Sequence, residues 1–161
     1  MKALPFAAVL AIATTLTACS DEGADGLTNV ERVQYFYDAY TDNDAELLDL
    51  VLASDIVSIP SPPDRDPGLE AFKASIDPVN QIFEDLTITP DQILEDGNFV
   101  VVRSRVTGVQ VGNFSGIPAQ DRPIDIMAID IHEFNDDGLV VEIHHVEDWL
   151  TGMFQMGAFD Q

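Results

Sequence analysis

The chain has 161 residues, of which 46% are hydrophobic, and this is enough for one globular domain. Its 29 acidic residues outnumber 7 lysines and arginines, so the formal net charge is −22. A surface this acidic repels polyanions, which excludes nucleic acid and anionic lipid surfaces as partners.

The first 19 residues have the pattern of a bacterial export signal. Lys2 precedes an apolar run, residues 3–16, that is too short to span a bilayer as a mature helix. The run leads into Leu-Thr-Ala-Cys, which resembles a lipobox, and Cys19 is the only cysteine in the chain. We therefore predict a lipoprotein signal peptide over residues 1–19 with lipidation at Cys19. An ordinary secretory signal with a chance cysteine is the alternative.

A short polar tether, residues 20–27, follows this signal, and the folded domain is expected over residues 28–161. Ser20 rather than Asp follows Cys19, which by resemblance to lipoprotein sorting favours the periplasmic face of the outer membrane. The protein would then touch the membrane only through its lipid anchor. The mature domain would have no thiol left for a disulfide, a metal or a nucleophile.

The beginning of the domain contains two sequence signals for the N-terminus of a helix. Thr28 and Glu31 form a capping box ahead of apolar residues at helical spacing, which predicts a helix over residues 29–41. Asp44 is placed to cap a second, shorter helix over residues 45–53.

A proline-rich loop follows, because residues 58–67 contain four prolines. A third helix is predicted from about Gly68. We expect Pro78 to kink or end this helix, with residues 79–83 as a continuation.

The second half of the domain is rich in β-branched residues and in apolar–polar alternation, which indicates strands. Helices first and consecutive antiparallel strands afterwards define an α+β fold. We expect a curved sheet around the helices that encloses an apolar cavity for a small hydrophobic ligand. The predicted segments are strands at 86–89 and 98–111, a strand or turn at 91–96, a loop at 112–122, hairpin strands at 124–134 and 139–147, and an apolar tail at 150–157.

The hairpin carries all three histidines of the chain. Asp137-Gly138 is typical of a two-residue type I′ turn, which places Asp136 opposite Leu139. Counting back from this turn gives the pairs Asp130–His145, Ile131–His144 and His132–Ile143. One face then carries Ile126, Ala128, Asp130, His132, Phe134, Val141, Ile143 and His145. His144 falls on the opposite face with Ile129, Ile131 and Val146, where we expect a dimer contact.

Several motifs resemble the SnoaL-like polyketide cyclase, or ester cyclase, family. They are Gly-Asn-Phe-Ser-Gly-Ile-Pro at 112–118, Ile-Asp-Ile at 129–131, Asp-Gly at 137–138, Asp148, and Gln-Met-Gly at 155–157. The resemblance covers about residues 28–157. It implies the cone-shaped α+β barrel of nuclear-transport-factor-two-like proteins, with about three helices on a strongly curved mixed or antiparallel sheet. It also implies a homodimer, no cofactor, and intramolecular aldol closure of polyketide esters.

The family's catalytic His and Asp would fall on Asp130 and His145, so the two residue types are exchanged here. Aldol closure needs a base beside a carbonyl and a donor for the resulting oxyanion. We expect His145 to be the acid/base, Asp130 to orient it, and His132 to donate to an enolate. The alternative is that the pair is only a satisfied polar contact. Asp148 matches the family motif and is a further catalytic candidate, although a helix cap or a place at the pocket rim suits it as well.

Four further residues are predicted to contact the ligand: Arg103, Gln110, Phe114 and Met127. An arginine in the cavity would hold a carboxylate or oxyanion, although a buried ion pair is the alternative for Arg103. Gln110 stands where the family often has a histidine. No metal is expected, although Asp130, His132, His145 and Glu147 share a face, because the helical spacings of metal sites are missing.

Two functions remain open from the sequence. The first is a cofactor-free cyclase, isomerase or hydratase acting on a small hydrophobic carbonyl compound. The second is a non-catalytic ligand-binding or interaction lipoprotein on the same fold. A cavity that is open to Asp130 and His145 favours the first, and a filled cavity favours the second.

Overall fold

The computed structural model describes residues 26–61 and 67–160. The expected signal peptide, Cys19 and most of the tether lie outside these ranges. Within them, no helix is long and apolar enough to cross a membrane.

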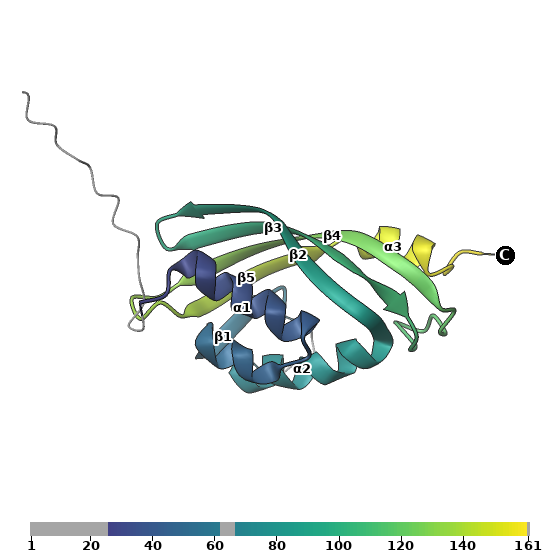
Figure 1. Cartoon of the computed structure of the whole chain (residues 1–161), viewed down its shortest axis with the longest axis horizontal. Coiled ribbons are helices and arrows are strands. Elements are labelled where there is room, and N and C mark those ends of the chain that lie inside the picture. Colours follow the sequence, from purple (N-terminus) through teal and green to yellow (C-terminus); the bar gives the residue numbers. More distant parts are fainter. Residues whose placement is uncertain (1–25, 62–66, 161) are drawn as a thin grey trace, which may run out of the picture.

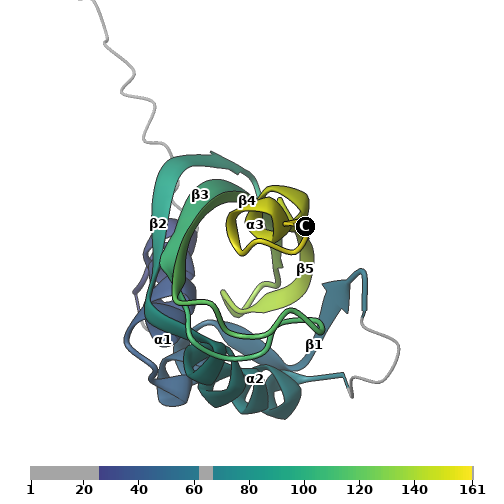
Figure 2. The ribbon, with the colours of Figure 1, turned by 90° about the vertical axis from the view of Figure 1, so that its right-hand side faces the viewer.

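The fold is α+β, with helices packed against one face of a curved five-stranded sheet (Figure 1). The strand order is β1-β5-β4-β3-β2, in which β1 is parallel to β5 and the other pairs are antiparallel. This confirms the predicted cone, although the sheet bends without closing into a barrel (Figure 2). The elements are α1 (Asn29–Thr41), η1 (Ala45–Leu50), β1 (Leu52–Ile59), α2 (Leu69–Ile82), β2 (Phe83–Asp96), β3 (Phe99–Gln110), β4 (Arg122–Phe134), β5 (Val140–Glu147) and α3 (Trp149–Gln155).

Helix α1 has the predicted bounds, whereas the two helices that follow end differently from the prediction. The Thr28–Glu31 capping box is present at the start of α1. Asp44 caps η1, but this is a 3₁₀ helix that ends at Leu50, not a helix that reaches residue 53. Helix α2 continues through Pro78 to Ile82. A proline removes one backbone hydrogen bond, and here the helix is held by its buried face, Phe72 and Ile76.

Strand β1 was not predicted, so the expected order of helices before strands is wrong. Its residues are followed by the proline-rich loop, and its partner β5 lies far away in sequence. Local patterns carry no signal for such a pairing. Strand β2 is also longer than expected and runs through Pro90, which an edge strand tolerates because its outer N–H groups need no partner.

The β4–β5 turn differs in length and type from the predicted type I′ turn, but the hairpin has the predicted register. Gly138 N donates to Asn135 O at 3.0 Å, and Asn135 N donates to Leu139 O at 2.9 Å, so the turn has three residues. Gly138 alone among them has a positive φ, +75°, which rules out type I′. A bulge at Val141 then restores the register, because Phe134 pairs with Val140 and Glu133 pairs with Glu142.

On the side of the bulge away from the turn, the predicted pairs Asp130–His145, Ile131–His144 and His132–Ile143 are all present. The bulge also changes which valine is buried: Val140 faces the core in place of Val141. The inner face of β5 therefore continues as Val140, Ile143, His145 and Glu147.

The core consists of two apolar clusters on the inner face of the sheet. One lies under α1 and includes Tyr37, Val102 and Ile143. The other lies toward α3 and includes Phe83 and Ile126. The functional cavity has walls from both clusters.

We expect Gly68→Ala to destabilise the fold at the start of α2. Gly68 has φ +100° and ψ 173°, a region open essentially to glycine, and a Cβ there would lie 2.8 Å from Ser54 O. The free energy of unfolding should fall by about 1–3 kcal/mol in urea denaturation. Gly97→Ala is the control, since Gly97 also has a positive φ but has no atom within 4 Å of its Cβ position. An equal loss in both variants would contradict the contact with Ser54.

Candidate functional site

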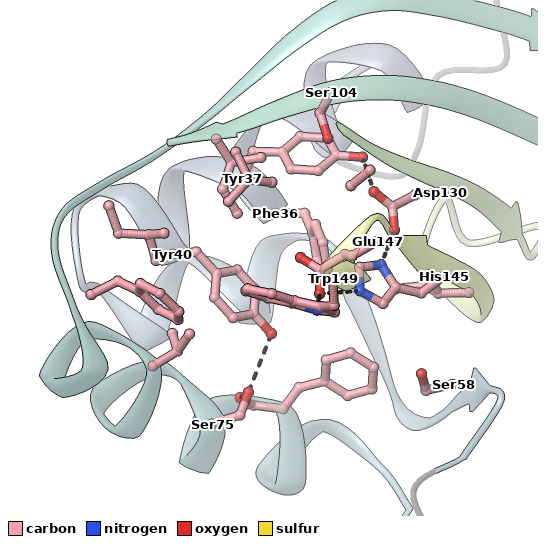
Figure 3. A pocket seen from close by; sticks show the side chains of 18 residues that line it. Phe36, Tyr37, Tyr40, Ser58, Ser75, Ser104, Asp130, His145, Glu147 and Trp149 are labelled. Atoms are coloured by element: carbon pink, nitrogen blue, oxygen red, sulfur yellow. Dashed lines mark hydrogen bonds and ion pairs between the residues drawn. The ribbon is translucent and has the colours of Figure 1, made fainter. Parts of the chain in front are cut away.

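A cavity of about 230 Å³ lies between the inner face of the sheet and helices α1 and α2. This is below the roughly 300–1,000 Å³ of pockets that hold drug-sized ligands, so it suits a small molecule. Most of its wall is aromatic or aliphatic, and the polar groups are few (Figure 3). It is lined by Phe36, Tyr37, Tyr40, Ser58, Phe72, Ser75, Val79, Phe83, Leu86, Ile88, Ser104, Val106, Ala128, Asp130, Ile143, His145, Glu147 and Trp149.

Strand alternation brings the polar side chains to this wall. Residues two apart on a strand share a face, so His145 and Glu147 of β5 point inward together. Asp130 of β4 lies directly opposite His145. Ser104 of β3 faces the same side.

Asp130 is the buried acid of the site, with only 1% of its surface exposed. Tyr37 of α1 donates its hydroxyl proton to Oδ2 at 2.9 Å, and His145 Nδ1 donates to Oδ1 at 2.5 Å. Both oxygens are therefore satisfied, which is what a buried carboxylate requires.

His145 lies between two carboxylates. Its Nδ1 contacts Asp130, and its Nε2 lies 3.2 Å from Glu147 Oε2. The same Glu147 oxygen accepts the indole N–H of Trp149 at 2.5 Å. Burial lowers the pKa of His145, but the hydrogen bonds and charges of Asp130 and Glu147 outweigh it and raise the pKa to about 10. At neutral pH this ring is an imidazolium.

His132 differs from His145 in both position and protonation. It is fully buried, does not line the cavity, and its Nε2 lies 3.1 Å from the Tyr37 hydroxyl. The Tyr37 hydroxyl donates its proton to Asp130, so its oxygen can only accept from His132. The ring proton of His132 is therefore on Nε2. Burial lowers the pKa of His132 to about 4, against the charge of Asp130. This placement corrects the expectation that His132 donates to an enolate in the cavity.

The site therefore holds two carboxylates and one imidazolium. Burial and the charge of Asp130 raise the pKa of Tyr37 far above its ordinary value, so its hydroxyl stays neutral. Among the residues that the structure describes, no lysine or arginine lines the cavity. A neutral ligand fits these charges better than an anion does.

Asp148 and Arg103 lie away from the cavity. Asp148 caps α3, because its carboxylate accepts from Thr151 N at 3.1 Å and Thr151 Oγ1 at 2.7 Å. Arg103 is on the outer face of β3, exposed, with Nη1 3.7 Å from Asp91 Oδ2. This corrects both expectations for Arg103, since it neither reaches the ligand nor forms a buried pair. Alternation on β3 gives the inner face to Val102 and Ser104.

Gln110, Phe114 and Met127 also differ from the expected ligand contacts. Gln110 is fully buried and donates Nε2 to the carbonyls of Gly112, Ile117 and Pro118, so it organises that loop. Phe114 packs against Trp149 with ring centroids 4.3 Å apart, behind the cavity wall. Met127 is 46% exposed on the outer face of β4.

Four residues that supply polar groups to the cavity wall were not predicted as functional: Tyr37, Ser104, Glu147 and Trp149. Glu147 had a signal, since it shares the face of His145. Ser104 also had one, because alternation on β3 turns it inward with Val102, whereas Tyr37 had none, because packing alone sets the position of α1. Among the described residues, no group of three or more His, Cys, Asp or Glu side chains is arranged to hold a metal ion.

The fold and the cavity define a class: the cone-shaped α+β fold of nuclear-transport-factor-two-like proteins, with a polar cluster on its inner wall. The sequence profile of the SnoaL-like polyketide cyclases matches residues 31–156. The chain therefore belongs to the SnoaL-like polyketide cyclase family, which confirms the resemblance in its motifs.

Similar solved structures support this assignment. TsrD from Streptomyces laurentii is 31% identical, with a TM-score of 0.76 over 81% of this chain and 96% of TsrD. A polyketide cyclase candidate from Bacillus cereus ATCC 10987 is 27% identical, with a TM-score of 0.69 over 80% of each chain. IdmH, a polyketide cyclase candidate from Streptomyces antibioticus, is 24% identical with a TM-score of 0.69 over 80% of this chain and 98% of IdmH, and shows the shared fold alone. The comparison with curated proteins gives no match.

NMR titration of the histidine rings tests the charge state of the site. We expect His145 to titrate near pH 10 and His132 near pH 4. Asp130→Asn removes a charge from His145, so its pKa should fall. Glu142→Gln on the outer face of β5 is the control and should leave the pKa unchanged. A His145 ring that titrates as a free imidazole in wild type and in Asp130→Asn would rule out the pair.

The same shift predicts how stability depends on pH. The folded pKa of His145, about 10, is above the unfolded value of 6.5. Its stabilising contribution is therefore fully present below pH 6.5 and is lost as the pH rises through about 10.

Proposed function

We propose that this protein is a cofactor-independent acid/base enzyme that acts on a small hydrophobic carbonyl compound. The observation that carries the proposal is the Asp130–His145 pair, which stands in the wall of an open apolar cavity. His145 is 41% exposed at its side chain, so a ligand can reach it, whereas Asp130 is buried behind it. The pair therefore places the His145 ring at the cavity surface, and Asp130 fixes its position from behind.

The chemistry follows from the charges. Removal of a proton beside a carbonyl creates an enolate, whose negative charge must be stabilised. An imidazolium on an apolar wall supplies positive charge near the enolate, and the neighbouring carboxylate of Glu147 supplies a proton acceptor. Cyclisation, isomerisation and hydration all begin or end with such a transfer.

The cavity wall limits the size and the polarity of the ligand. Phe36, Tyr40, Phe72 and Phe83 offer aromatic surface, and the volume of about 230 Å³ admits a compact molecule. The similar structure from Bacillus cereus is described as a polyketide cyclase candidate, which agrees with a carbonyl substrate. The described residues leave this cavity unfilled, which supports an enzyme, whereas a filled cavity would have favoured the non-catalytic ligand-binding or interaction lipoprotein.

Exchange of α-protons for deuterium tests the proposal without knowledge of the natural substrate. We expect the wild-type domain to accelerate exchange in 1-tetralone, a small bicyclic ketone, in D₂O at neutral pH. Asp130→Asn should reduce the rate by about 10²-fold or more, the usual range for general acid–base groups. The measurement is the loss of the α-proton NMR signal.

Glu142→Gln serves as the control, since Glu142 pairs with His144 outside the cavity. Exchange at the uncatalysed rate in 1-tetralone and in a panel of similar ketones would contradict the enzyme proposal. The alternative, a non-catalytic binding lipoprotein, would then be pursued through the molecule that co-purifies with the protein.

We also propose that the protein is exported, anchored through Cys19, and dimeric. The lipobox-like residues 16–19 support the anchor. The exposed side chains of Met127, Ile129 and Val146 form an apolar strip on the outer face of β4 and β5, which supports a contact with a second copy.

Metabolic labelling tests the anchor. A palmitate analogue should label the wild-type chain in a bacterial host, and Cys19→Ser should abolish the label, because this is the only cysteine. Retention of the label in Cys19→Ser would contradict lipidation there. Sedimentation equilibrium of the unlipidated domain measures the dimer directly.

A further inference from the structure

Three residues on neighbouring strands lie in one row across the inner face of the sheet. Ser104 of β3 pairs with Ala128 of β4, and Ala128 pairs with Glu147 of β5. All three line the cavity. Because adjacent strands are about 4.8 Å apart, the Ser104 and Glu147 backbones stand about 10 Å apart with only a methyl group between them.

Glu147 has a carboxylate oxygen that is free to act on a ligand. Its Oε2 is held by Trp149 and His145, whereas Oε1 makes no hydrogen bond to any described residue. Asp130 has no such oxygen, because Tyr37 and His145 occupy both of its oxygens. Both ring nitrogens of His145 are occupied as well. Glu147 is therefore the proton acceptor that a ligand can meet directly.

Ser104 offers the complementary group. It is 1% exposed, lines the cavity, and its Oγ has no hydrogen-bond partner among the described residues. A buried hydroxyl without a partner costs about 1–3 kcal/mol, which a ligand oxygen would recover. The hydroxyl can donate its proton to that oxygen.

We propose that Glu147 and Ser104 are the catalytic residues that touch the substrate, which is a neutral ketone or ester seated over Ala128. This inference rests on the proposed function and names its reacting groups. Glu147 Oε1 takes a proton from the carbon beside the carbonyl. The electron pair of that C–H bond forms the C=C bond of the enolate, and the charge moves to oxygen. Ser104 donates a hydrogen bond to this oxygen.

His145, Asp130, Tyr37 and Trp149 are positioning residues in this arrangement. Trp149 and His145 fix one oxygen of Glu147 and leave the other facing the cavity. Asp130 and Tyr37 hold His145 from behind. In the exchange reaction, protonated Glu147 swaps its proton for a solvent deuteron and returns the deuteron to carbon. The C–H bond becomes a C–D bond, and the protein ends unchanged.

The test compares four variants in the 1-tetralone exchange assay, with the affinity for 1-tetralone measured in parallel. We expect Glu147→Gln to lower the turnover rate by about 10²-fold or more while the dissociation constant changes by less than about threefold. Ser104→Ala should lower turnover by about 10-fold or more, and Ser104→Thr should restore it because the hydroxyl is retained. Glu142→Gln, the same change on the outer face of β5, should match wild type.

The outcomes separate this inference from the function itself. If wild type exchanges, Asp130→Asn is impaired and Glu147→Gln retains wild-type turnover, the assignment of Glu147 is overturned and the enzyme proposal stands. If Ser104→Ala retains full turnover, the assignment of Ser104 is overturned. If wild type shows no exchange at all, the proposed function fails first. Thermal unfolding of each variant identifies any loss of activity that comes from misfolding.

Discussion

Asp130 places the strongest constraint on this structure, because it is an acid buried at the centre of the domain. A carboxylate without partners in such a place is costly, so the protein must bring donors to it. Tyr37 arrives from α1 and His145 from β5, and each meets a different oxygen. One side chain therefore joins helix α1 to the β4–β5 hairpin, whose positions are set by packing and by strand register. Hydrophobic replacement of buried ion pairs is often neutral or stabilising, so stability alone does not account for the pair.

The polar cluster lies where the two apolar clusters of the core meet the cavity. Aromatic side chains exclude water from most of the wall, which strengthens the interactions between the charges that remain. One imidazolium stands between two carboxylates there, and no lysine or arginine of residues 26–61 and 67–160 lines the cavity. The cluster is therefore net negative, and the formal net charge of the whole chain, −22, is negative as well. Both features disfavour anionic ligands.

The exchange of residue types relative to the family resemblance has a structural consequence. Because residues 130 and 145 face each other, an exchange of His and Asp keeps the pair and moves the imidazole from β4 to β5. On β5 the ring is two residues from Glu147, on the same face, and it gains a second carboxylate. The chain thus shares the fold of its family.

The sequence determined the fold class, the strands β3, β4 and β5, and the pairing of Asp130 with His145, because alternation with a period of two fixes which residues share a face. The predicted turn was too short by one residue, and the bulge at Val141 restored the register. Alternation also carried the signal that Arg103 and Met127 face outward, opposite Val102 and Ala128. Only the tertiary structure supplied β1, whose partner is distant in sequence, and the meeting of Tyr37 with Asp130. Such contacts join separate elements, so they are decided by how the helices pack on the sheet and leave no periodic trace in the chain.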